Sequence, residues 1–187
     1  MPRITLIGYR GSGKSTIAAG LASRLGCSWQ DADDALEAEA GTTIAEFITN
    51  RGEPAFRDLE TMVLERLLAV ESGVLATGGG VVLREQNRHL LRRVGRPVVW
   101  LAAPADVLRG RLAADPSTAA RRPALAGGDV LDEVAAAVAT REPLYRSAAD
   151  AVIDVSTTPP AELVARIAAW LETWIPSAGT PSSEPIR

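Results

Sequence analysis

The segment that decides the fold is Gly8-Tyr9-Arg10-Gly11-Ser12-Gly13-Lys14-Ser15, which matches the pattern G-x-x-x-x-G-K-[ST] at every fixed position. It follows the apolar run Ile4–Ile7, typical of a buried parallel strand, and it opens an amphipathic stretch from Lys14 to Leu25. The backbone N–H groups of such a loop and the N-terminus of the next helix bind phosphate. In this context the motif predicts binding of a nucleoside triphosphate with Mg²⁺.

The side chains of this loop have distinct expected roles. The Lys14 ammonium can reach the β- and γ-phosphates, and the Ser15 hydroxyl can ligate Mg²⁺. Lys14 is also the only lysine among the 20 basic residues of the chain, which indicates a role that arginine cannot fill. The alternative is a glycine-rich turn that merely joins a strand to a helix. The residues expected to bind ATP here are Gly11, Ser12, Gly13, Lys14, Ser15 and Thr16.

Strands and helices alternate along the rest of the chain. Further strands are expected at 28–31, 74–76, 98–101 and 151–155, and helices at 34–40, 43–50, 53–70, 84–94, 105–113, 131–145 and 160–174. This alternation predicts an α/β fold of the P-loop NTPase type, with a five-stranded, mostly parallel sheet and helices on both faces. One kinase domain is expected over residues 1–175. The Pro- and Gly-containing stretch 115–128 is expected to be a mobile lid, and 176–187 a disordered tail.

The length, charge and apolar runs of the chain limit the kinds of partner that it is expected to bind. The 187 residues suit one domain, and a net charge of −3 argues against nucleic acid as the main partner. No apolar run approaches the roughly 20 residues that span a bilayer, so no membrane partner is expected. With no signal peptide before the first strand, we expect a cytoplasmic enzyme.

Two rival classes of nucleotide-binding protein lack their motifs here. A GTPase needs an N-K-x-D base-reading motif, which is impossible because the only lysine lies in the phosphate-binding loop. A transporter ATPase needs an L-S-G-G-Q signature, which is absent. A small kinase remains as the interpretation.

Several further motifs, in order along the chain, resemble those of shikimate kinases from Ile4 to about Trp174. They are Asp31-Ala32-Asp33, Gly52-Glu53 with Phe56-Arg57, Gly78-Gly79-Gly80, Arg122-Pro123 and Arg141-Glu142-Pro143-Leu144-Tyr145. The resemblance implies an ATP-dependent phosphotransferase with an alcohol acceptor. It implies transfer of the γ-phosphate of ATP to the 3-hydroxyl of shikimate, with Mg²⁺, in aromatic amino-acid biosynthesis. It also implies a monomer.

The paired aspartates suit this chemistry. Asp31 and Asp33 are two apart on a strand, so both side chains leave one face near its carboxyl end, where ligands of open α/β sheets bind. One carboxylate can hold Mg²⁺, and the other can orient the attacking hydroxyl or accept its proton. By resemblance, Asp31 takes the metal role and Asp33 the catalytic and substrate role. The alternative is that both merely cap the next helix.

The resemblance also assigns the acceptor residues. Arg57 and Arg141 would hold the carboxylate of shikimate, because a guanidinium pairs with a carboxylate through two hydrogen bonds. The shikimate ring would lie against the bare backbone of 78–80, that is, Gly78, Gly79 and Gly80. The alternatives are surface ion pairs for the arginines and a flexible turn for the glycines.

The lid has its own expected residues. Arg122 would bind ATP and act catalytically by neutralising charge on the transferring phosphoryl group. Neighbouring Arg121 leaves this assignment open, and Ala124 stands where the family has leucine. Arg111 resembles a family arginine near the adenine ring. Two other functions stay open: a related gluconate or nucleoside monophosphate kinase, and a nucleotide-binding regulator without catalysis.

Overall fold

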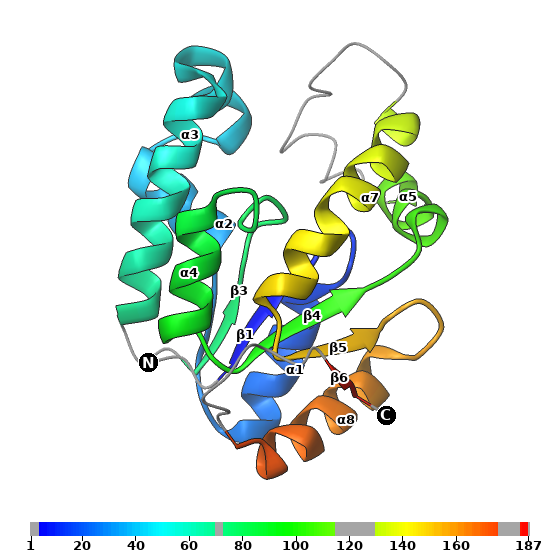
Figure 1. Cartoon of the computed structure of the whole chain (residues 1–187). Coiled ribbons are helices and arrows are strands. Elements are labelled where there is room, and N and C mark those ends of the chain that lie inside the picture. The colour runs from blue at the N-terminus through cyan, green and yellow to red at the C-terminus, as the bar shows by residue number, and fades with distance from the viewer. Residues whose placement is uncertain (1–3, 70–72, 115–129, 176–183, 187) are drawn as a thin grey trace.

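The computed structural model describes residues 4–69, 73–114, 130–175 and 184–186, and within these the side chains of 130–133 and 184 are not described. Its centre is one sheet in the order β2-β3-β1-β4-β5-β6, with every paired neighbour parallel. The strands are β1 (Ile4–Ile7), β2 (Trp29–Asp31), β3 (Val74–Ala76), β4 (Val98–Ala102), β5 (Ala151–Asp154) and β6 (Glu184–Pro185). Figure 1 shows them with their connecting helices.

The helices match the predicted pattern, with ends that shift by a few residues. They are α1 (Lys14–Leu25), α2 (Ala32–Ala40), α3 (Ile44–Ala69), α4 (Glu85–Val94), α5 (Ala105–Ala114), α7 (Val130–Ala148) and α8 (Pro160–Thr173). α3 spans both helices expected over 43–70. A kink separates them at Gly52, where the backbone leaves helical geometry and φ is 82°. Only glycine adopts this conformation readily. α7 contains Pro143 and continues to Ala148, three residues beyond the end expected at 145.

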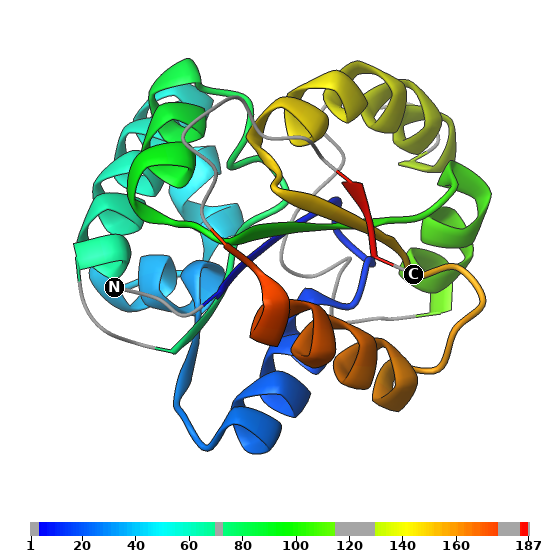
Figure 2. The ribbon, with the colours of Figure 1, turned by 60° about the horizontal axis from the view of Figure 1, so that its bottom comes forward.

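Helices cover both faces of the sheet, as predicted. α1 and α8 pack on one face, while α3, α4 and α7 cover the other (Figure 2). Alternate strand residues supply the two cores: Leu6 and Ile153 face α1 and α8, whereas Leu75 and Trp100 face the opposite layer. None of the helices within the described ranges is long and apolar enough to cross a bilayer.

The sheet has one strand more than the five expected. β6 pairs with β5 through Ala151 and Val152, and Ile186 donates a backbone hydrogen bond of 2.8 Å to Val152 O. The Ile186 side chain is 6% exposed and belongs to the core beside α8. The prediction of a disordered tail is therefore wrong for 184–186. Composition alone could not reveal that one apolar residue would cover the open edge of β5, where Pro185 is tolerated on an outermost strand.

Other parts of the sequence prediction lie outside the described residues. The expected lid over 115–128, including Arg121 and Arg122, falls there, as do 176–183 of the expected tail. Helices α5 and α7 lie on either side of the 115–129 segment in the chain and contact each other.

Candidate active site

The phosphate-binding loop joins β1 to the first turn of α1, as the motif predicts. Lys14 Nζ donates hydrogen bonds to Gly8 O at 2.9 Å and to Tyr9 O at 3.0 Å. The ammonium is thereby held across the loop between its first residues and the start of α1. Ser15 is exposed in the first turn of that helix. The predicted ATP-binding residues Gly11, Ser12, Gly13, Lys14, Ser15 and Thr16 thus occupy one loop and one helix start.

The first aspartate of the pair lies against this loop. Ser15 Oγ donates a hydrogen bond of 2.6 Å to Asp31 Oδ2. The other carboxylate oxygen of Asp31 accepts from the backbone N–H of Asp33 at 2.9 Å, which caps α2. Asp31 therefore caps the next helix and also faces Ser15, so the two interpretations of this residue are compatible. The Ser15 and Asp31 oxygens form a hard-donor pair beside the phosphate-binding loop.

The glycine triplet after β3 is buried where several predicted site residues meet. A Cβ on Gly78 would lie 2.6 Å from Asp33 Oδ1 and 3.3 Å from Glu60 Oε1. A Cβ on Gly80 would collide with the guanidinium of Arg57. A side chain at either position would push these charged groups aside, so the triplet lets Asp33, Glu60 and Arg57 gather around one stretch of bare backbone.

The same triplet abuts the phosphate-binding loop. A Cβ on Gly79 would lie 3.0 Å from the backbone nitrogen of Arg10. β1 and β3 are neighbours in the sheet, with Leu6 beside Ala76, so the loops that follow them must run side by side. The nucleotide side and the expected acceptor side of the site are therefore in direct contact at Gly79.

Arg57 is fixed before any ligand binds. Its side chain is buried and pairs with Glu60 at 2.8 Å and with the partly exposed Glu53 at 3.0 Å. Burial opposes the positive charge, but the attraction and hydrogen bonds of Glu60 and Glu53 outweigh it and raise the pKa of Arg57. The guanidinium is therefore charged and oriented next to Gly80.

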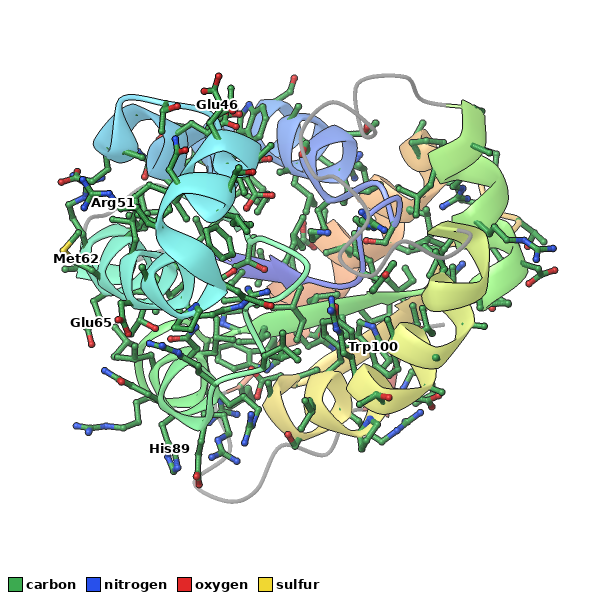
Figure 3. The ribbon with its side chains drawn as sticks, turned by 90° about the horizontal axis from the view of Figure 1, so that it is seen from above. Glu46, Arg51, Met62, Glu65, His89 and Trp100 are labelled. Carbon is green, nitrogen blue, oxygen red and sulfur yellow. The ribbon has the colours of Figure 1, made fainter. Side chains whose placement is uncertain are left out.

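Arg141 approaches from α7. Its Nη1 donates to Gly79 O at 3.3 Å, and the hydroxyl of Tyr145 donates to the same oxygen at 2.5 Å. Tyr145 is buried and stacks on Trp100, with ring centroids 5.7 Å apart; Figure 3 labels Trp100 beside α7. Burial raises the pKa of the Tyr145 phenol, so the hydroxyl stays protonated and keeps donating. One turn of α7 thus anchors the glycine triplet.

Arg111, expected near the adenine ring, lies between two other loops. Its Nη2 donates to Val155 O at 2.6 Å, and its Nη1 donates to Gly11 O at 3.5 Å. It therefore joins the segment after β5 to the phosphate-binding loop. This position is compatible with a nucleotide contact, and that role stays a prediction. The single histidine, His89, points outward from α4, away from the site (Figure 3).

The structure brings most of the predicted site residues to one edge of the sheet, at the carboxyl ends of β1, β2 and β3. Sequence reasoning missed Glu60 and assigned no role to Tyr9 or Tyr145. Glu60 could have been found, because it is a charged residue on the helix face that also carries Phe56 and Leu64, and it is three residues after Arg57. Brought together are Lys14, Ser15, Asp31, Asp33, Arg57, Gly78, Gly79, Gly80 and Arg141.

Comparison with known proteins identifies the family. The family model described as shikimate kinase matches residues 10–172. A shikimate kinase of Rhodopirellula baltica is 48% identical over 151 residues, covering 81% of this chain and 80% of its own. One from Nitratidesulfovibrio vulgaris is 46% identical, covering 81% and 85%. The structure of a shikimate kinase from Acinetobacter baumannii in complex with shikimate superimposes with a TM-score of 0.84 at 32% identity, covering 92% and 94%. The chain belongs to the shikimate kinase family, as its sequence motifs predict.

Proposed function

We propose that this chain transfers the γ-phosphate of ATP to the 3-hydroxyl of shikimate, giving shikimate 3-phosphate and ADP, and that the site residues act as set out below. Family membership makes the chain an ATP-dependent phosphotransferase with an alcohol acceptor, as predicted. The observation that carries the proposal is the position of the glycine triplet, because Gly79 adjoins the phosphate-binding loop while Gly78 and Gly80 adjoin a buried pair of opposite charges, Glu60 and Arg57. Such a pair suits a small polar acid.

The nucleotide side supplies phosphate binding. The N–H groups of the glycine-rich loop and the N-terminus of α1 would hold the phosphates, and Lys14 would exchange its two carbonyl partners for phosphate oxygens. Because these donors are already in place, they stabilise charge that develops on the transferring group without reorganising.

The oxygens of Ser15 and Asp31 fit Mg²⁺. Protein kinases and ATPases hold this ion through one or two carboxylates together with substrate phosphates, and these two side chains already lie 2.6 Å apart beside the loop. When bound there, Mg²⁺ would neutralise charge on the β- and γ-phosphate oxygens.

The acceptor side orients the attacking alcohol. Asp33 lies at the glycine triplet, where its carboxylate would accept the hydrogen bond of the 3-hydroxyl and then its proton. The bond from that oxygen to the γ-phosphorus forms as the bond to the ADP oxygen breaks. Arg57 and Arg141, both beside 78–80, would fix the ring by its carboxylate.

An assay of acceptor choice tests the proposed reaction. ADP release would be followed with shikimate, gluconate or a nucleoside monophosphate as the acceptor, each with MgATP. Turnover with shikimate alone is expected. Preference for gluconate or a nucleotide would establish one of the related kinases instead, and ATP binding without turnover on any acceptor would indicate a regulator.

Arg141→Ala should raise the KM for shikimate by at least about tenfold, because it removes a charge-assisted hydrogen-bonding partner of the carboxylate. The KM for ATP should change much less. Steady-state kinetics with each substrate varied in turn measures both. Arg146→Ala is the matched control, since Arg146 lies on the same helix and pairs with exposed Glu142. If the ATP constant rose and the shikimate constant did not, Arg141 would belong to the nucleotide side.

Mutation can show which of the two arginines of the expected lid, Arg121 or Arg122, acts on the transferring phosphoryl group. Arg122→Ala should lower kcat at least about tenfold, because one guanidinium at the transferring phosphoryl group is lost. Arg121→Ala should leave kcat within about twofold, as surface charge changes usually do. Turnover at saturating substrates measures both variants. The reverse pattern would make Arg121 the lid arginine.

A further inference from the structure

Tyr9, the residue after the first glycine of the phosphate-binding loop, places a large aromatic side chain at the site. It is 5% exposed and belongs to a small core with Leu108 and Leu112 of α5 and Val134 of α7. The ring is therefore fixed in place by the two helices that flank 115–129 in the chain.

The face of this ring lies against a guanidinium that the proposed function needs. The Cζ atom of Arg141 is 5.2 Å from the centroid of the Tyr9 ring, within the range of an attractive cation–π contact. The hydrogen bond of Arg141 to Gly79 O is long, at 3.3 Å. The positive charge of Arg141 also acts on the Tyr145 phenol and partly offsets the rise of its pKa caused by burial. A ring, a carbonyl and a phenol together surround the guanidinium.

We propose that Tyr9 is a positioning residue that holds Arg141 in place for the carboxylate of the acceptor. This inference rests on the proposed role of Arg141 in binding shikimate. An arginine has many rotamers, and ordering them on binding weakens affinity, so a guanidinium that is already ordered binds a carboxylate more tightly. Gly79 O and the Tyr9 ring both restrict where the guanidinium can lie, and its five N–H donors outnumber the one hydrogen bond made to Gly79.

Tyr9 also connects the two substrates of the reaction. Its backbone carbonyl accepts a hydrogen bond of 3.0 Å from Lys14 Nζ, while its ring contacts Arg141. One residue of the phosphate-binding loop thus contacts the basic groups expected to bind each substrate. The acceptor's arginine is positioned by the loop that binds the nucleotide and not by α7 alone.

Replacing Tyr9 by leucine or by phenylalanine distinguishes the contribution of the aromatic ring from that of the hydroxyl group. Tyr9→Leu keeps an apolar side chain in the core but removes the aromatic face, so the KM for shikimate should rise about three- to thirtyfold, as expected for one lost cation–π contact. The KM for ATP should stay within about twofold of the parent. Tyr9→Phe retains the ring and should restore the KM for shikimate. Tyr9→Met is measured as a second ring-free variant in case Tyr9→Leu does not fold.

A matched control and a double mutant complete the test. Trp174→Leu removes the ring from another arginine pair, Arg96 over Trp174 at 5.5 Å, and should not change the KM for shikimate. In an Arg141→Ala background, Tyr9→Leu should add no further rise in the KM for shikimate, because the contact of the ring with Arg141 no longer exists and only its contact with Arg10, at 5.8 Å, is left to remove.

The outcomes separate this inference from the proposed function. If Arg141→Ala leaves the KM for shikimate unchanged, the carboxylate role fails and the inference fails with it. If Arg141→Ala raises the constant and the ring-free variants at position 9 do not, only the positioning role of Tyr9 is overturned. It is also overturned if Tyr9→Leu has the same effect with and without Arg141.

Discussion

Lys14→Arg is expected to lower kcat by roughly 10²-fold or more, because it disturbs a preorganised charge at the transferring phosphoryl group. Lys14 Nζ is a compact donor that reaches Gly8 O at 2.9 Å and Tyr9 O at 3.0 Å, inside a loop whose backbone closes around it. A guanidinium is a wide planar fork of the same charge. It should collide with the γ-phosphate or push the nucleotide out of line. Turnover at saturating shikimate and MgATP measures the loss.

A second measurement is possible because Lys14 is the only lysine of the chain. An amine-directed reagent can therefore modify only Lys14 and the N-terminal amine. With MgATP bound, Lys14 should be shielded while the N-terminal amine stays reactive. Intact-mass counting of labels with and without MgATP reports the difference. Equal labelling of Lys14 in both states would show that the loop does not hold the nucleotide as proposed.

The folding of Lys14→Arg needs its own control, because a loss of activity could reflect a loss of structure. Lys14 donates to two carbonyls of the loop, so the substitution disturbs the loop and leaves the two large cores on the faces of the sheet untouched. The thermal midpoint should therefore stay within a few degrees of the parent, as about 1 kcal/mol shifts a domain of this size by about 2–4 °C. A large drop would mean that the lysine is needed for folding.

The fold could be predicted from sequence because its signals are local. Short apolar runs alternate with amphipathic stretches, and glycine ends α1 at Gly26 and α2 at Gly41. Thr43 and Glu46, three residues apart, form a capping box at the start of α3, with Glu46 N donating to Thr43 Oγ1 at 3.2 Å. The sixth strand could not be predicted, because its stability comes from Ile186 meeting β5 and α8, segments far away in the sequence.

The site could be predicted only where a motif fixes both residue type and spacing. Lys14, Ser15 and the triplet 78–80 belong to such motifs. Glu60 and Tyr9 do not, because their importance depends on what the fold places beside them: Arg57 three residues earlier on a buried helix face, and Arg141 on a helix more than a hundred residues later. A charged side chain on an apolar face is the signal that sequence reasoning can use for Glu60. No local pattern indicates the contact of Tyr9 with Arg141.

Asp33→Asn should lower kcat by at least about 10²-fold, the lower end of what a general base or orienting carboxylate supplies. Asparagine keeps the shape of the side chain but loses the charge and can no longer accept a proton. The position is confined, since Asp33 Oδ1 lies 2.6 Å from where a Cβ on Gly78 would be, so an isosteric change should not displace its neighbours. The KM for shikimate should change less than kcat, because the missing interaction strengthens as the hydroxyl loses its proton.

Asp34→Asn provides the matched control for this prediction. Asp34 is the next residue in the first turn of α2 and is exposed, whereas Asp33 is partly buried. Both changes remove one negative charge from the same helix start, so each loses the same favourable interaction with the helix dipole. Any shared effect on stability therefore cancels in the comparison, and only Asp33→Asn should reduce turnover at saturating substrates. Near-normal turnover of Asp33→Asn would remove this carboxylate from the chemistry, and an equal loss in both variants would assign the effect to the helix start.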